Sequence, residues 1–117
     1  MAISRINPGK RLSGAVVHSE TGLVFLAGQT ADNPKADIKG QTADVLRKIE
    51  GLLAKAGTSK SQLLSAQIWV TDMRHFAAMN EIWDQWIDPA NPPARATVQA
   101  ALANPELLVE IMVVAAK

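Results

Sequence analysis

The sequence predicts an α+β fold in which two helices pack on one face of a mixed β-sheet. Two segments carry apolar residues at helical spacing, and short β-rich segments precede, separate and follow them. Stretches that contain glycine or proline divide these segments. The expected order is β-β-α-β-α-β-β, with room for an extra strand near residues 3–6. Because the chain has 117 residues, we expect one domain that covers residues 1–117.

The first predicted elements are a hairpin and a loop. Residues 16–17 and 23–26 are β-rich runs, and the polar cluster at residues 19–22 between them is typical of a turn. The hairpin should end at residues 27–29. A polar loop that contains a proline then runs from residue 30 to about residue 40.

A helix followed by a strand is predicted next. The apolar stripe of the helix consists of Val45, Ile49, Leu52, Leu53 and Ala56. Its polar side holds Asp44, Arg47, Lys48 and Lys55. Gly57 stands where a helix end favours a left-handed residue. Residues 64–71 then alternate between apolar and mostly polar positions, which is typical of a strand.

The second half of the chain predicts another helix and two more strands. Asp72 can cap a helix that carries an apolar face, and the prolines at positions 89, 92 and 93 end it. Residues 94–102 and 107–116 flank the turn-like residues 103–106, and we interpret them as a second hairpin. The last strand is apolar on both sides, so a neighbouring subunit is the expected cover for the other sheet face.

Composition excludes several classes of function. The net charge is +1 and no Lys/Arg run occurs, so nothing indicates a nucleic-acid or membrane partner. The absence of cysteine excludes disulfides, thiol nucleophiles and thiolate zinc sites. No signal peptide or spanning segment is predicted, which favours the cytoplasm. No standard catalytic or metal-binding motif occurs, and we interpret His18 and His75 as solvated or structural.

Three polar residues stand where apolar ones are expected. Glu110 is the only charge between residues 107 and 116, so it must be paired, protonated or face a cavity, unless the strand lies at a sheet edge and turns it to solvent. Asn80 lies within the apolar stripe of its helix, as a site residue or as a buried amide satisfied by the backbone. Arg95 opens a strand and shares a face with Thr97 and Gln99, as a ligand clamp or as a surface group.

Together these positions resemble the RidA/YjgF family, whose members are reactive-intermediate (imine or enamine) deaminases. The resemblance runs from residue 5 to residue 116. The separation between Arg95 and Glu110 matches the family's pattern. The other carriers are residues 23–29, 56–57, 70–73, 76–80, 93–98 and 109–111, together with Ala115.

The resemblance implies a homotrimer with a chorismate-mutase-like fold, whose sheets form a central barrel with three clefts between subunits. Arg95 would hold a substrate carboxylate, and Glu110 would orient or activate the attacking water. Gly28 would offer a backbone N–H to the region where Arg95 holds the carboxylate, while Asn80 and Thr97 would line the pocket. This chemistry requires no metal or organic cofactor.

The register of the predicted hairpin decides where Arg95 and Glu110 lie. If the hairpin closes symmetrically, they share a face about 13 Å apart along the strands. A slip of one residue would put them on opposite faces.

The chain also departs from the family's pattern. Leu12 stands where active members carry a tyrosine, Ala27 replaces a serine, and Thr97 stands where a cysteine is often found. The segment before the arginine is shorter and carries Trp83 and Trp86. These changes predict a divergent member with a more apolar pocket.

The leading functional hypothesis is hydrolysis of 2-imino or enamino acids to 2-keto acids and ammonia. A narrower form is a pathway-specific deaminase of a ring-cleavage product, which would suit the aromatic wall. A non-catalytic binder of small carboxylates such as keto acids is the alternative, and it would need Arg95 but not Glu110. RNA cleavage, also attached to this family, is disfavoured by the near-neutral charge.

Overall fold

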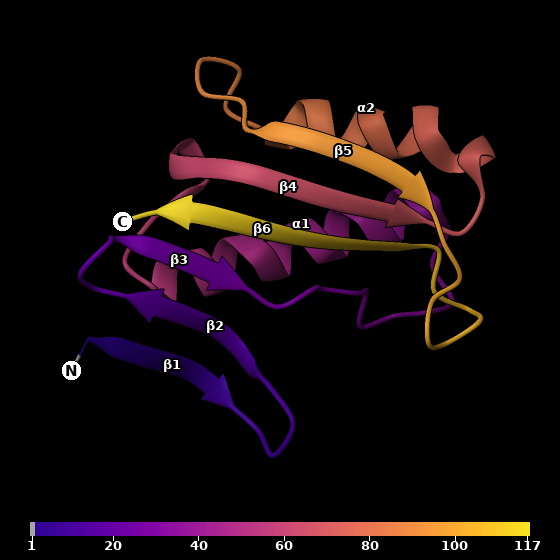
Figure 1. The fold of residues 1–117 in the computed structure, drawn as a ribbon. Helices are drawn as coiled ribbons and strands as arrows, with labels where there is room; N and C mark the ends of the chain where they lie inside the picture. Colours follow the sequence, from indigo (N-terminus) through magenta and orange to yellow (C-terminus); the bar gives the residue numbers. More distant parts are fainter. Residues whose placement is uncertain (1) are drawn as a thin grey trace.

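The computed structural model describes residues 2–117, which form one six-stranded mixed sheet with two α-helices on one face (Figure 1). The strands are β1 (Ile3–Pro8), β2 (Ser13–His18), β3 (Leu23–Leu26), β4 (Leu63–Val70), β5 (Ala94–Gln99) and β6 (Val109–Ala116). The helices are α1 (Ile38–Lys55) and α2 (Phe76–Trp86), with short 3-10 turns η1 (Lys60–Gln62) and η2 (Met73–His75). The predicted fold class and element order are confirmed, and the extra strand near the N-terminus is β1.

The predicted hairpin at the end of the chain is wrong. The strand order is β1-β2-β3-β6-β4-β5, so β6 lies between β3 and β4, antiparallel to both (Figure 1). β5 instead pairs with β4 in parallel, because α2 carries the chain back across the sheet before β5 begins. A strand that is apolar on both sides fits a central position, whereas the more exposed β5 fits an edge.

The two faces of the sheet differ in what covers them. Side chains of residues that are paired on neighbouring strands point to the same face of the sheet. In β4, Ala66, Ile68 and Val70 are buried on the face that the helices cover. The opposite face, which we call the open face, has no cover from residues 2–117. Its exposed apolar side chains include Phe25, Met112 and Val98.

Local capping explains where the helices begin and end. The side chain of Asp37 accepts a hydrogen bond from the Gly40 N–H at 2.8 Å and so starts α1. Gly57 follows α1 with φ +82°, the left-handed conformation that the sequence predicts there. Asp72 caps η2 by accepting from the Arg74 N–H, so its predicted role falls one turn before α2 itself.

A buried glutamine fixes the segment that leads into β6. Gln41, in the first turn of α1, is fully buried. Its Nε2 donates to the carbonyls of Pro34, Ala36 and Glu106, and its Oε1 accepts from the Leu108 N–H at 2.8 Å. The loop before α1 and the start of β6 are therefore tied together. Within residues 2–117, neither helix has the length and apolarity needed to span a bilayer.

Candidate functional site

Arg95 sits on the edge strand β5 with its guanidinium free to bind a ligand. Its Cζ lies 5.2 Å from the centre of the Trp83 ring of α2, a cation–π contact with a side chain that is only 5% exposed. Within residues 2–117 the guanidinium makes no hydrogen bond or ion pair. Burial lowers the pKa of Arg95 and nearby Asp84 opposes that shift, but an arginine stays charged in either case. The side chain is therefore a half-buried cation that forms no ion pair in the described part of the chain.

Two buried acceptors lie near this arginine. Thr97 shares the helix-side face of β5 with Arg95, because their partners in β4 are Ile68 and Ala66. Asn80 is one turn before Trp83 on the same side of α2. Within residues 2–117, Asn80 Oδ1 and Thr97 Oγ1 are both buried without a hydrogen-bond partner. Buried polar atoms are seldom left unpaired, so a ligand or water is expected to complete them.

One of these atoms bears on the two interpretations of Asn80, whose role stays a prediction. The oxygen of a purely structural amide would accept a hydrogen bond from the backbone, whereas Asn80 Oδ1 accepts none within residues 2–117. The helix α2 runs back along β5, since the Gln99 side chain accepts from the Met73 N–H at one end and Arg95 meets Trp83 at the other. Asn80 therefore lies beside the middle of β5, where Thr97 is placed.

Glu110 and Gly28 form a second cluster. Glu110 lies in the central strand β6, not at a sheet edge, and points to the open face beside Met112 and Val114. Its carboxylate packs directly against Gly28, where an added Cβ would overlap Oε2 and lie 3.1 Å from Cδ. The Gly28 N–H has no partner within residues 2–117. The Gly28 N–H therefore lies beside the Glu110 carboxylate.

Ala27 and Gln29 hold the chain on either side of Gly28. The Ala27 N–H donates to the Gly14 carbonyl at 2.9 Å, and the Gln29 N–H donates to the Ile111 carbonyl at 2.8 Å. The Gln29 side chain donates to the Ala27 carbonyl. Gly28 is therefore fixed beside Glu110 by ordinary strand-like bonds.

Arg95 and Glu110 lie on opposite faces of the sheet. Arg95 is the partner of Ala66, and Glu110 is the partner of Trp69, three residues further along β4. β4 separates the two strands, so we place their Cα atoms about 14 Å apart from standard strand spacing. The two residues do not converge within one subunit.

Within one subunit, Leu12 lies far from Arg95. It is in the turn between β1 and β2 and is 61% exposed. This turn belongs to the sheet edge opposite β5. Four strand spacings, about 19 Å, separate β2 from β5.

Trp83 and Trp86 of α2 form a tilted aromatic pair beside Arg95. The rings of Trp83 and Trp86 are 5.5 Å apart at an angle of 56°. Trp86 Nε1 donates to Glu50 Oε1 of α1, and Lys60 Nζ lies 5.3 Å from the Trp86 ring centre. This aromatic pair therefore links Arg95 on β5 to α1.

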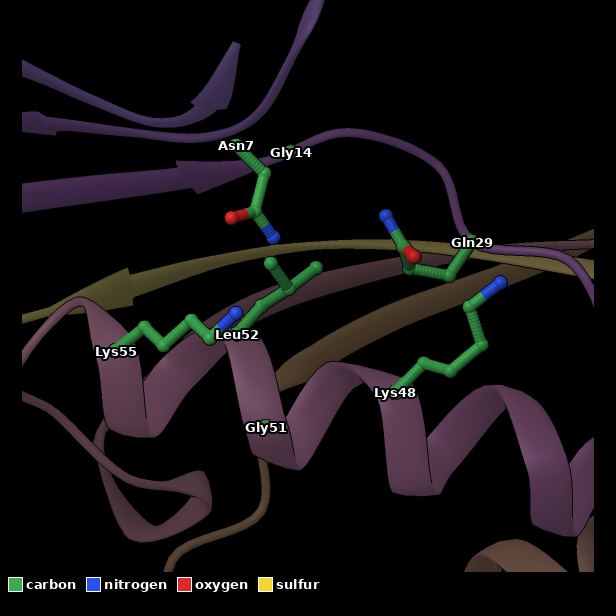
Figure 2. Close-up of a pocket in the computed structure, with 7 residues that line it drawn as sticks. All are labelled: Asn7, Gly14, Gln29, Lys48, Gly51, Leu52 and Lys55. Atoms are coloured by element: carbon green, nitrogen blue, oxygen red, sulfur yellow. The ribbon is translucent and has the colours of Figure 1, made fainter.

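A separate pocket, which the sequence did not indicate, lies between α1 and the β1–β2 hairpin (Figure 2). Its volume is about 260 Å³. None of the predicted site residues lines it, although Gln29 follows Gly28 directly. The lining residues are Asn7, Gly14, Gln29, Lys48, Gly51, Leu52 and Lys55. Helical spacing had placed the two lysines on the polar side of α1, and only the docking of the hairpin turns that side into a pocket wall.

The sequence is similar to known proteins over nearly its whole length. The sequence model of the family described as Endoribonuclease L-PSP matches residues 2–117. A RutC family protein of Haemophilus influenzae is 44% identical over 116 residues, covering 98% of each chain. The RutC family protein YoaB of Escherichia coli is 43% identical, covering 99% of each chain.

Solved structures agree with this assignment. A YjgF-family protein of Neisseria meningitidis superposes with a TM-score of 0.95 at 42% identity, over 100% of this chain and 96% of that one. A YjgF/YER057c/UK114-family protein of Mycobacterium tuberculosis gives a TM-score of 0.86 at 31% identity, over 98% of this chain and 99% of that one. The match of sequence and fold over nearly the whole chain places this protein in the RidA/YjgF family.

Proposed function

We propose that this protein hydrolyses reactive 2-imino or enamino acids to 2-keto acids and ammonia, in clefts between the subunits of a homotrimer. The observation that carries the proposal is the Arg95 guanidinium, which is half-buried and makes no ion pair or hydrogen bond within residues 2–117. A planar fork of this kind binds a carboxylate through two parallel hydrogen bonds. The substrate class is therefore a small 2-substituted carboxylic acid.

The groups beside Arg95 suit the atoms next to that carboxylate. Asn80 Oδ1 is a buried acceptor that needs a donor, and the buried Thr97 hydroxyl can accept from a donor or donate. The protonated nitrogen of a 2-imino acid supplies N–H donors one bond from the carbon that bears the carboxylate. A keto acid lacks this donor, so these acceptors favour the substrate over the product.

Glu110 and Gly28 suit the attack by water. A carboxylate accepts a hydrogen bond from water and removes a proton as the oxygen bonds to the imine carbon. The free Gly28 N–H can hold an oxygen of the substrate beside it. The C–N bond then breaks, and water and the iminium carboxylate become a keto acid and an ammonium ion. Positioning supplies much of the acceleration, since imines also hydrolyse in water.

The geometry of one subunit requires a second subunit for this reaction. Arg95 and Glu110 lie on opposite faces of the sheet, so one substrate can meet both only if neighbouring subunits each supply one. The open face is suited to such an assembly. It exposes Phe25, Val98 and Met112, and it holds a hollow of about 330 Å³ beside Ala94 and Ala96.

Leu12 also fits an inter-subunit cleft. It is an exposed apolar side chain at the sheet edge opposite β5. In a closed ring of three copies, opposite edges of neighbouring sheets meet. Leu12 of one subunit would then cover the Arg95 site of the next.

A direct assay tests the reaction. An amino-acid oxidase generates 2-imino acids in situ, semicarbazide traps residual imine, and keto-acid formation is followed with wild type, Arg95→Ala and Glu110→Gln. Acceleration by wild type that both variants lose supports the proposal. If wild type gives no acceleration but binds keto acids through Arg95, the protein is a carboxylate-binding protein. A parallel incubation with single-stranded RNA examines the activity named in the family model's description.

Mixed trimers test the shared site. Arg95→Ala and Glu110→Gln subunits are unfolded together in equal amounts and refolded. If each site takes its arginine from one subunit and its carboxylate from the next, about one quarter of the sites regain both groups. Regained activity near one quarter of wild type supports the inter-subunit cleft. No regain, although mixed trimers are seen by native mass spectrometry, would place both groups in one subunit and contradict the proposal.

A further inference from the structure

We propose that the pocket between α1 and the β1–β2 hairpin is a second ligand site, which takes a small carboxylate with a short apolar body (Figure 2). Within one subunit it is separate from the Arg95 cluster, which lies at the other edge of the sheet, although in the proposed trimer the Leu12 turn of this hairpin would lie beside the Arg95 site of a neighbouring subunit. This inference does not depend on the proposed reaction. It rests on the shape of the pocket and on the side chains that reach it.

Two glycines shape the pocket. Gly51 lies in the middle of α1, where glycine weakens a helix, yet a Cβ there would meet no atom within 4 Å. No close packing therefore requires this glycine, and its lack of a side chain leaves the hollow open. Gly14 is different, because a Cβ there would lie 3.2 Å from Leu52 Cδ2, and the leucine would have to shift by a few tenths of an ångström. Together they leave a space whose floor is the buried Leu52.

The charges around the pocket favour an anion. Lys55 makes no ion pair or hydrogen bond within residues 2–117, and no aspartate or glutamate is among the lining residues. Figure 2 shows Lys55 lying along the helix beside Leu52, with the Asn7 amide pointing toward the same leucine from the hairpin. The Asn7 amide also has no hydrogen-bond partner within residues 2–117. A carboxylate placed between Asn7 Nδ2 and Lys55 Nζ would satisfy both donors.

Asn7 is held in an uncommon backbone conformation. Its φ is +50°, the left-handed region, although it lies within strand β1. Asparagine tolerates this region better than most residues do. Residues in sparsely populated conformations are concentrated at ligand sites, so the backbone of Asn7 is consistent with an amide that is aimed at a ligand.

The far end of the pocket limits the ligand. Lys48 Nζ donates to the Thr30 carbonyl at 2.8 Å and to Asp32 Oδ1 at 2.9 Å, so its charge is largely neutralised. The Gln29 amide is turned away, since its Nε2 donates to Ala27. One strong anion position therefore remains, at Asn7 and Lys55. With a volume of about 260 Å³ the pocket is at the small end for ligand sites, which suits an aliphatic acid of about four to six carbons.

The test removes the first carboxylate site from the measurement. Arg95→Ala protein, labelled with ¹⁵N, is titrated with sodium pentanoate, 1-pentanol and inorganic phosphate, and amide shifts are followed. We expect pentanoate to shift the amides of Asn7, Gln29 and residues 51–55, with little response to the alcohol or to phosphate. Equal binding of phosphate would overturn the requirement for an apolar body, and shifts confined to other regions would overturn the site.

Variants in the same background identify the groups responsible. Lys55→Met keeps the length of the side chain and removes the charge, and Gly51→Leu fills the hollow. Each should weaken pentanoate binding at least about tenfold. The matched control is Lys39→Met on the same helix, whose lysine pairs with Glu81 away from the pocket. Unchanged affinity in Lys55→Met, or an equal loss in Lys39→Met, would contradict the proposal.

Discussion

Replacing Gly28 with alanine should move the Glu110 carboxylate without unfolding the protein. An alanine Cβ at this position would overlap Glu110 Oε2 and lie 3.1 Å from Cδ and 3.3 Å from Cγ. Carbon atoms in ordinary contact are about 3.5–4.0 Å apart, so the carboxyl group must retreat by something on the order of 1 Å. The group that moves is the end of a flexible side chain on the open face, and the backbone can remain in place.

The expected effects on stability and activity therefore differ. Gly28 does not adopt positive φ, so alanine is allowed there and restricts the unfolded chain. The free energy of unfolding should change by less than about 1 kcal/mol. A misplacement of about 1 Å at a reacting group costs about 100-fold, and kcat/KM for the 2-imino acid should fall by about that factor.

Two measurements check this reasoning. Urea denaturation gives the free energy of unfolding, and the coupled oxidase assay gives kcat/KM for wild type, Gly28→Ala, Glu110→Gln and the double variant. If the alanine acts through the carboxylate, the double variant is no slower than Glu110→Gln alone. Full activity in Gly28→Ala, or losses that multiply in the double variant, would refute the reasoning.

Three further predictions follow from other contacts. Trp83→Leu should weaken 2-oxobutyrate binding at Arg95 about fivefold, because the guanidinium loses its cation–π contact, and Trp83→Phe should be intermediate. Calorimetry measures these affinities, and equal values would show that the ring does not position the guanidinium. Gln41→Leu should lower the free energy of unfolding in urea by about 3 kcal/mol, because buried backbone groups lose their partner; a loss under about 1 kcal/mol would contradict this. The hydrogen bond from the Arg74 side chain lowers the pKa of Asp72 to about 2, so the stability that this carboxylate provides is complete above about pH 4 and is lost as the pH falls toward 2. Asp72→Asn should therefore make the melting temperature depend less on pH between about 4 and 2. An unchanged dependence on pH would refute this prediction.

The local elements were predictable from the sequence because each has its own period and end signals. The stripe of α1, the glycine after it and the alternation of β4 all depend on neighbours along the chain. The pairing of the last two strands depends on distant residues. β6 fits between β3 and β4 because all three bury one face under the helices, and no turn signal near residues 103–106 carries that information.

The candidate site shows the same division. Arg95, Glu110 and Asn80 stood out in the sequence because each is polar in an apolar setting, and their roles remain predictions. Which face each occupies follows from the position of β6 in the sheet, which the chain's own order does not disclose. The pocket at Asn7 and Lys55 was missed for a related reason, since these two residues are 48 positions apart in the sequence.

The central position of β6 has a consequence for how the protein is made. β6, the strand that joins the N-terminal sheet half to β4 and β5, is the last of the six described strands to leave the ribosome. Until it emerges, β3 and β4 each present an unpaired edge, and the core under α1 lacks one wall. Synthesis through residue 116 must therefore precede closure of the sheet, and the nascent protein depends on rapid folding once β6 has emerged, or on a chaperone, to keep those two edges from pairing with other chains.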